Sequence, residues 1–186
     1  MKSKTNRTFN LSASFGMGLL FLIPLTLCLC SGCVSSARTD AMQARPVINH
    51  RHAATVGLRV IGQCAYGNQV QVSNDALRAA LEKTITDCGL FSGIRSAEAA
   101  DHLLEVTVMG YGTQGPGIKM KTTLTTRWKL SRRVSSELLF NESIHKEFVA
   151  TVSDAFDGTT RWRVSNERVV RDSIEEGMRR LAELKL

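Results

Sequence analysis

The sequence lacks the residue combinations that most enzyme classes need. It has four histidines in 186 residues, and it contains no H-E-x-x-H motif, no G-x-S-x-G elbow and no glycine-rich phosphate loop. Asp154 and Asp157 in the segment DAFDG do not have the alternating oxygen ligands of a calcium loop. The sequence therefore predicts a protein without catalytic activity, cofactor or metal ion.

Metal-binding patterns are also missing around the histidines. His50 and His52 have no third ligand near them in the sequence, so a solvated segment is the better interpretation than a metal site. His102 and His145 lie inside predicted strands, where we expect a hydrogen-bonded or surface imidazole.

Long apolar runs are absent except at residues 15–30, which follow the basic residues Lys2, Lys4 and Arg7. This run is shorter than the ~20 residues that span a bilayer, and Pro24 interrupts it. The pattern predicts a signal peptide, residues 1–32, that is removed. Removal takes away three of the 24 basic residues and none of the 17 acidic ones, so the net charge falls from +7 to +4. This mild charge argues against a nucleic-acid partner.

The end of the apolar run, LCLCSGCVSS, holds three of the five cysteines. Its SGC segment resembles the lipobox of bacterial lipoproteins, although Cys30 stands where leucine is usual. The resemblance implies palmitate or a similar acyl chain on Cys33, which becomes the N-terminus and a membrane anchor. By resemblance to lipoprotein sorting, Val34 implies the periplasmic leaflet of the outer membrane. An ordinary secretory site or an uncleaved anchor stays open.

Apolar periodicity is missing from residues 33–55, which we interpret as a flexible tether. Residues 56–186 then form a single periplasmic domain. Strands are predicted at residues 56–62, 103–109, 119–130 and 138–148, and helices at residues 73–89 and 165–184, with Ser165 as the second N-cap. The clearest signal is the alternation in which Met120, Leu124, Trp128 and Leu130 are apolar and their odd-numbered neighbours polar.

The element order β-α-β-β-β-α predicts an α+β fold with two layers. The helices should cover one face of a mainly antiparallel sheet, because only one side of the predicted hairpin is apolar. Cys64 and Cys88 are the cysteines of the domain. An oxidising compartment favours a disulfide between them, but the predicted helix separates them by more than a disulfide spans, so the pairing stays open.

Two runs, ADHLLEVTV and SDAFDGTTRWRVSNERVVRDSIEEGMRRL, resemble the YajG-type uncharacterised proteobacterial lipoproteins. The matching residues are Asp154, Gly158, Arg161, Arg163, Asn166, Glu167, Arg171 and Ile174. The resemblance implies an α+β fold of the anticodon-binding type, and that family has no assigned activity. Such a likeness does not transfer function.

The sequence therefore predicts a binding or envelope-assembly module held to the membrane by lipid on Cys33. An envelope protein or an anionic envelope polymer is the expected partner. The alternative is a glycolipid or lipopolysaccharide carrier, which needs an apolar pocket. Two basic segments could form the partner surface: Lys119, Lys121, Arg127 and Lys129, and Arg161, Arg163 and Arg171. A solvated strand face and an internal ion-pair network are their alternative interpretations.

Overall fold

The sheet is built around β6 (Met120–Arg132), in which polar and apolar residues alternate. Its even-numbered residues from 120 to 130 are buried, and the odd-numbered ones are exposed or partly exposed, as the period of a half-buried strand requires. β6 pairs antiparallel with β5 (His102–Thr113) and with β7 (Leu138–Ala150). The computed structural model describes residues 37–114 and 117–186 of the chain.

Two parallel strands extend the sheet beyond β5. β1 (His52–Ile61) pairs with β5, and β4 (Phe91–Arg95) pairs with β1, giving the order β4-β1-β5-β6-β7. The sequence prediction missed β4, a five-residue edge strand directly after a helix. In the segment predicted as a loop, β2 (Cys64–Tyr66) and β3 (Gln69–Val72) form a separate antiparallel hairpin.

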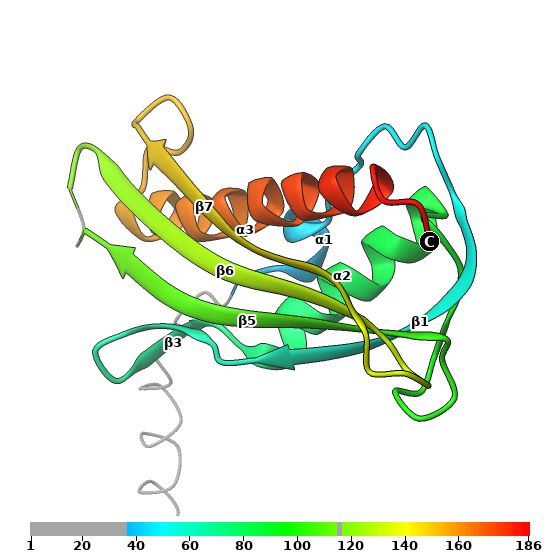
Figure 1. Cartoon of the computed structure of the whole chain (residues 1–186). Helices are drawn as coiled ribbons and strands as arrows, with labels where there is room; N and C mark the ends of the chain where they lie inside the picture. Colours follow the sequence, from blue (N-terminus) through cyan, green and yellow to red (C-terminus); the bar gives the residue numbers. More distant parts are fainter. Residues whose placement is uncertain (1–36, 115–116) are drawn as a thin grey trace, which may run out of the picture. The chain divides into compact units, whose positions relative to one another are not determined.

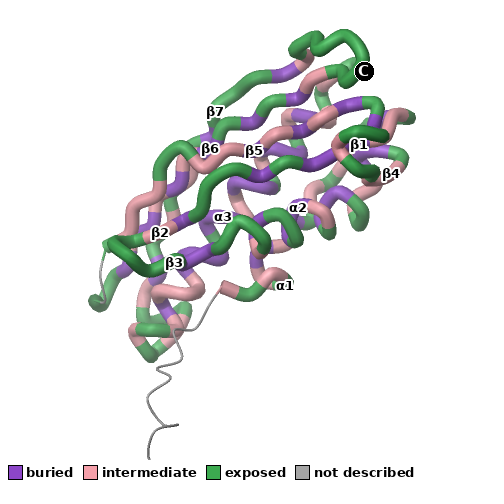
Figure 2. The backbone as a smooth tube through the Cα atoms, turned by 90° about the horizontal axis from the view of Figure 1, so that it is seen from below, coloured by how far each residue is buried: buried purple, intermediate pink, exposed green. Residues whose placement is uncertain are grey.

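The helices cover one face of the sheet (Figure 1). α2 (Asn74–Cys88) begins at its N-cap Ser73, whose hydroxyl accepts from the Ala76 backbone N–H, and ends at Gly89 in a left-handed conformation with φ 63°. α3 (Gly158–Ala182) is the longer helix. The predicted α+β two-layer fold is confirmed, and the buried residues gather between its layers (Figure 2). Within the described part of the chain, no helix combines the length and apolarity that a membrane crossing needs.

α3 starts seven residues before the predicted N-cap. Its N-cap is Asp157, whose carboxylate accepts from the backbone N–H groups of Thr159 at 3.3 Å and Thr160 at 2.6 Å. Ser165 lies inside the helix, fully buried, and its hydroxyl bonds to the Thr122 hydroxyl of β6. The prediction of Ser165 as N-cap was wrong because the first two turns of α3 bury polar side chains, which hides the helical period of apolar residues.

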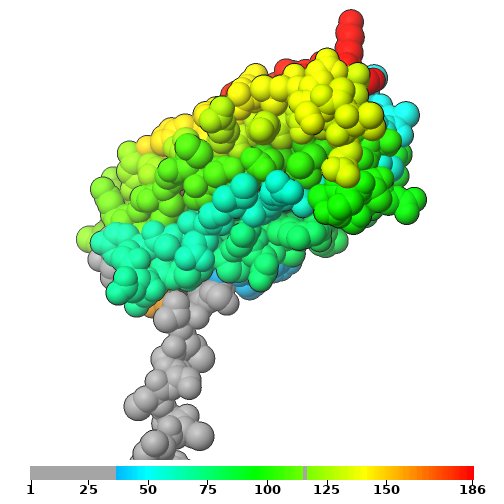
Figure 3. All heavy atoms as spheres, turned by 60° about the horizontal axis from the view of Figure 1, so that its bottom comes forward, coloured from blue at the N-terminus to red at the C-terminus, as the bar shows by residue number. Residues whose placement is uncertain are grey.

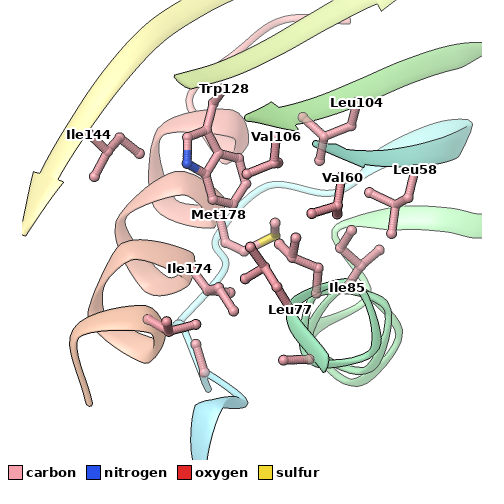
Figure 4. Close-up of a cluster of buried hydrophobic side chains, with 14 of the residues drawn as sticks. Leu58, Val60, Leu77, Ile85, Leu104, Val106, Trp128, Ile144, Ile174 and Met178 are labelled. Atoms are coloured by element: carbon pink, nitrogen blue, oxygen red, sulfur yellow. The ribbon is translucent and has the colours of Figure 1, made fainter. Parts of the chain in front are cut away.

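The space between sheet and helices is filled by large apolar side chains (Figure 4). Trp128 of β6 and Ile144 of β7 point toward α3, which contributes Ile174 and Met178. Gly177 makes room for this packing, because a Cβ atom there would lie 2.5 Å from the Trp128 ring. The covered face of the sheet is therefore a closely packed core.

The structure departs from the predicted tether between residues 37 and 55. α1 (Thr39–Met42) packs on α2 and α3, and Met42 is fully buried. The Ala44 backbone N–H donates to Thr84 Oγ1 at 3.1 Å. His52, expected in a solvated segment, is buried at the start of β1 and donates from Nε2 to the Leu181 carbonyl at 2.9 Å. The apolar residues of this segment follow no helical or strand period, and the domain boundary predicted at residue 56 was wrong because β1 already begins at His52.

Cys64 and Cys88 are free thiols that lie near opposite ends of α2. Cys64 pairs with Val72 of β3, just before the N-cap of α2, whereas Cys88 is the last residue of this 15-residue helix. Such a helix is about 22 Å long, and a disulfide needs Cα atoms within about 7 Å. Burial raises the pKa of the Cys64 thiol to about 12, which keeps it protonated.

Candidate functional site

The face of the sheet opposite the helices is open and carries the first predicted basic group. The odd-numbered residues of β6 point to this face, including Lys121, Arg127 and Lys129, while Lys119 precedes the strand and is exposed. In the surface view of Figure 3, atoms of β5, β6 and β1 lie side by side, and the red C-terminal residues reach only its upper margin. A partner could therefore approach this face without moving a helix.

Neighbouring strands neutralise part of this basic group. Lys121 forms an ion pair with Glu147 of β7 at 2.6 Å, and Arg127 donates from Nε to Asn141 Oδ1 at 2.8 Å. Glu105, the register partner of Lys129, forms an ion pair with Arg59 of β1 at 3.6 Å. Within the described residues, Arg127 and Lys129 have no carboxylate within ion-pair distance. They are the cations of β6 most available to an anionic partner.

Small polar residues make up the middle of the open face. Gly112 lies opposite Thr123, and a Cβ atom on it would approach the Thr123 hydroxyl to 2.9 Å. Thr125 bonds to His145 Nδ1 at 2.9 Å, so the expectation of a hydrogen-bonded surface imidazole is correct for His145. This part of the open face therefore carries mainly small side chains, so hydroxyls and backbone groups are partly exposed beside the cations of β6.

Arg161, from the second predicted basic group, is buried and holds loops together. Its Nη1 donates to the carbonyls of Ala155 at 2.8 Å and Phe156 at 2.6 Å, and its Nη2 donates to the Gly117 carbonyl at 2.8 Å. These bonds connect the loop before α3 to the loop between β5 and β6. Arg161 therefore does not belong to an accessible surface.

Arg163 anchors the start of the described chain through Glu167. Its Nη1 lies 3.1 Å from Glu167 Oε1, and the same oxygen accepts from the Arg38 backbone N–H at 2.9 Å. The Glu167 side chain is nearly buried. This is the internal network that the sequence allowed as an alternative, and Arg171, further along α3, is only partly exposed. The two basic groups therefore do not form one surface.

The sequence interpretation missed a polar cluster between α3 and the sheet. Tyr111, beyond the end of the strand predicted at residues 103–109, lies in β5 and donates to Asn166 Oδ1 at 2.7 Å, and burial raises its pKa above the usual range. Trp162 Nε1 donates to Thr113 Oγ1 at 3.0 Å, and its ring packs edge-on against Tyr66 at 6.0 Å. These three aromatic residues come from β2, β5 and α3, so no local sequence signal brings them together.

No family model matches the chain, and no curated protein matches it. A solved structure of a DUF330 family-model protein from Xanthomonas campestris is similar, with a TM-score of 0.57 and 11% identity over 73% of this chain and 88% of that chain. A hypothetical protein from Chlamydia trachomatis has a TM-score of 0.53 and 5% identity over 71% and 97% of the two chains. A minor lipoprotein from Acinetobacter baumannii has a TM-score of 0.47 and 11% identity over 69% of this chain and 91% of that chain. The first two likenesses concern the fold alone.

Proposed function

We propose that this chain is a lipid-anchored envelope protein without catalytic activity that binds a partner on the open face of its sheet. The observation that carries the proposal is the contrast between a filled core and an uncovered sheet face that presents Arg127 and Lys129. Anionic envelope polymers and acidic protein surfaces offer the complementary charge. Acylation at Cys33 would hold the protein in the periplasmic leaflet of the outer membrane, as the lipobox-like segment predicts.

The filled core favours this function over the glycolipid or lipopolysaccharide carrier. A carrier of this kind needs an apolar cavity, and the space between the layers holds Trp128, Met178 and their neighbours (Figure 4). A groove of about 410 Å³ lies between the end of α2 and β4, and its lining combines polar residues with apolar ones: Arg51, Thr86 and Ser92, and Ile85, Phe91 and Ile94. Such a mixed lining suits polar ligands better than acyl chains.

The anchor is tested by substituting Cys33 with serine, with Cys30→Ser as the matched control. Wild type and Cys30→Ser should incorporate a palmitate analogue and fractionate with the outer membrane, because the thiol of Cys33 is the acceptor. Cys33→Ser should lose both. Label that persists in Cys33→Ser, or that disappears in Cys30→Ser, would contradict the assignment.

The open face is tested by reversing its available cations. The double variant Arg127→Glu and Lys129→Glu should co-sediment less with purified peptidoglycan sacculi, which are rich in carboxylates, and capture less partner protein from solubilised envelopes. Charge reversal of Arg78 and Lys83 on the exposed side of α2 is the matched control. Binding through the open face should weaken with salt, which screens charges over about 8 Å at physiological strength. Equal recovery of both variants would leave the open face as a solvated surface.

A further inference from the structure

Several of the exposed apolar side chains of the described residues lie at one end of the folded domain, while others, Val134 among them, lie elsewhere. Phe156 in the loop before α3 is 94% exposed, and Ile118 in the loop between β5 and β6 is 76% exposed. Val152, Tyr66 and Val70 are also exposed, and all belong to loops or the β2–β3 hairpin at this end (Figures 1 and 2). We define these five residues as the apolar end. The turn between β6 and β7 and the C-terminus lie at the opposite end.

The apolar end is held in place rather than loose. Arg161 binds the carbonyl of Phe156 and the carbonyl of Gly117, next to Ile118, so a single buried guanidinium joins the backbone beside both exposed side chains. Asp157 caps α3, and Asp154 Oδ2 accepts from the Thr151 backbone N–H at 2.8 Å. The structure thus holds an aromatic ring outward on a loop whose backbone is hydrogen-bonded, an arrangement that suits contact with another apolar phase.

Chain length limits how far the proposed lipid can lie from the start of the described chain. The Arg38 backbone N–H is fixed to Glu167, which lies nine residues, or about 14 Å, from the first residue of α3. Cys33 precedes Arg38 by five residues, which span at most about 18 Å. Because Met42, Ala44 and His52 are buried in the domain, residues 37–55 are not a free tether, and the chain length between Cys33 and Arg38 limits how far an acylated Cys33 would hold the domain from the bilayer.

We propose that the apolar end rests on the lipid surface, with Phe156 and Ile118 entering the interfacial region. This inference rests on the proposed acylation at Cys33. Exposed aromatic and aliphatic side chains suit the boundary between headgroups and acyl chains. Lys119 beside Ile118 can meet lipid phosphates, and the carboxylates of Asp154 and Asp157 can meet the ammonium group of phosphatidylethanolamine. In this orientation α3 points away from the bilayer, and the open face of the sheet stays accessible from the side.

The test uses tryptophan reporters in the acylated full-length product, reconstituted into nanodiscs of phosphatidylethanolamine and phosphatidylglycerol with brominated acyl chains. Phe156→Trp and Ile118→Trp each add a reporter at the apolar end. Val134→Trp, at a residue 95% exposed in the opposite turn, and Lys83→Trp on the helix layer are the matched controls. Bromine should quench at least half of the added fluorescence of the first two and almost none of the controls, because bromine quenches only at short range. Circular dichroism should give all four the wild-type fold, since these side chains are largely exposed.

The outcomes separate this inference from the proposed function. Mass spectrometry of the reconstituted protein reports whether Cys33 carries lipid, and its absence would remove the proposed anchor. An acylated protein whose Phe156→Trp and Ile118→Trp reporters are unquenched would overturn the lipid contact alone. Quenching at Lys83→Trp instead would mean that the helix layer faces the bilayer. A blue shift of Phe156→Trp that grows with protein concentration in detergent would assign the apolar end to a second copy of the chain.

Discussion

The polar groups on the two faces of the sheet have different kinds of partners. On the covered face, Thr126 of β6 bonds to Ser173 of α3 at 2.8 Å and accepts from Trp128 Nε1 at 2.9 Å. On the open face, Thr125, one residue away, bonds to an exposed histidine. Buried polar groups need fixed partners, whereas exposed ones can exchange theirs with water. The polar groups of the covered face therefore stabilise the fold, and those of the open face are available to bind a partner.

Substituting Trp128 should produce the largest difference in stability between the two faces. Trp128→Ala should lower the free energy of unfolding by about 3 to 5 kcal/mol, because it leaves a cavity beneath α3. Arg127→Ala, on the open face, should lower it by less than about 0.5 kcal/mol. Urea denaturation measures both. Equal losses would show that the two faces do not differ in packing.

Gly177 tests the same core from the side of the helix. Gly177→Ala should destabilise the protein by about 1 to 3 kcal/mol, because the new Cβ atom overlaps the Trp128 ring. At an exposed helix position the same change would stabilise by about 0.5 to 1 kcal/mol. Gly93→Ala in β4, where a Cβ atom meets nothing within 4 Å, is the control. Adding Trp128→Phe should recover part of the loss, and a Gly177→Ala protein as stable as wild type would contradict the close packing.

Neighbouring threonines compare the two faces at nearly constant side-chain size. Thr126→Val should cost about 1 to 3 kcal/mol, because the Trp128 N–H and the Ser173 hydroxyl lose their partner in a dry environment. Thr125→Val should change the unfolding free energy by less than about 0.5 kcal/mol, since water replaces the lost bond. Thermal unfolding of the two variants measures the difference. Similar melting temperatures would mean that the buried hydroxyls contribute little.

The alternation in β6 was enough to predict which residues face the helices and, with the element order, the fold class. By position it also puts Thr122 and Thr126 on the covered face, but it could not reveal which groups of α3 bond to their hydroxyls. The first turns of α3 and the packing of Met42 were missed for a related reason. Their burial comes from contacts distant in sequence, which leave no local period.

The candidate site was less predictable than the fold. Counting basic residues selected Lys121, which Glu147 neutralises, together with Arg127 and Lys129, which have no such partner among the described residues. The difference comes from strand register, because it determines which residue of β7 or β5 lies opposite each cation. Arg161 is equally basic in sequence, yet it is buried, and three backbone carbonyls hold its guanidinium. Only the structure separates these roles.

The smallest expected effect compares histidines on the two faces. The sequence interpretation was wrong for His102, which is buried on the covered face without a hydrogen-bond partner for either ring nitrogen in the described residues. Burial lowers the pKa of His102, Arg132 and His52 act in the same direction, and Asp101 opposes them. The unfolded chain therefore binds the proton more readily, so stability should be complete above about pH 6.5 and decline as the pH falls below it.

Urea midpoints between pH 7.5 and 5.5 measure this decline. The carboxyl groups with lowered pKa values, Glu176 at about 2 among them, stay ionised throughout that range and do not contribute. His102→Gln should flatten the dependence because it removes the titrating ring from the covered face, and His145→Gln should leave it unchanged because that ring lies in solvent on the open face. A decline that persists in His102→Gln would move the effect to another group. A decline that disappears in His145→Gln instead would mean that the open face takes part in folding stability, and the division of roles between the two faces would fail.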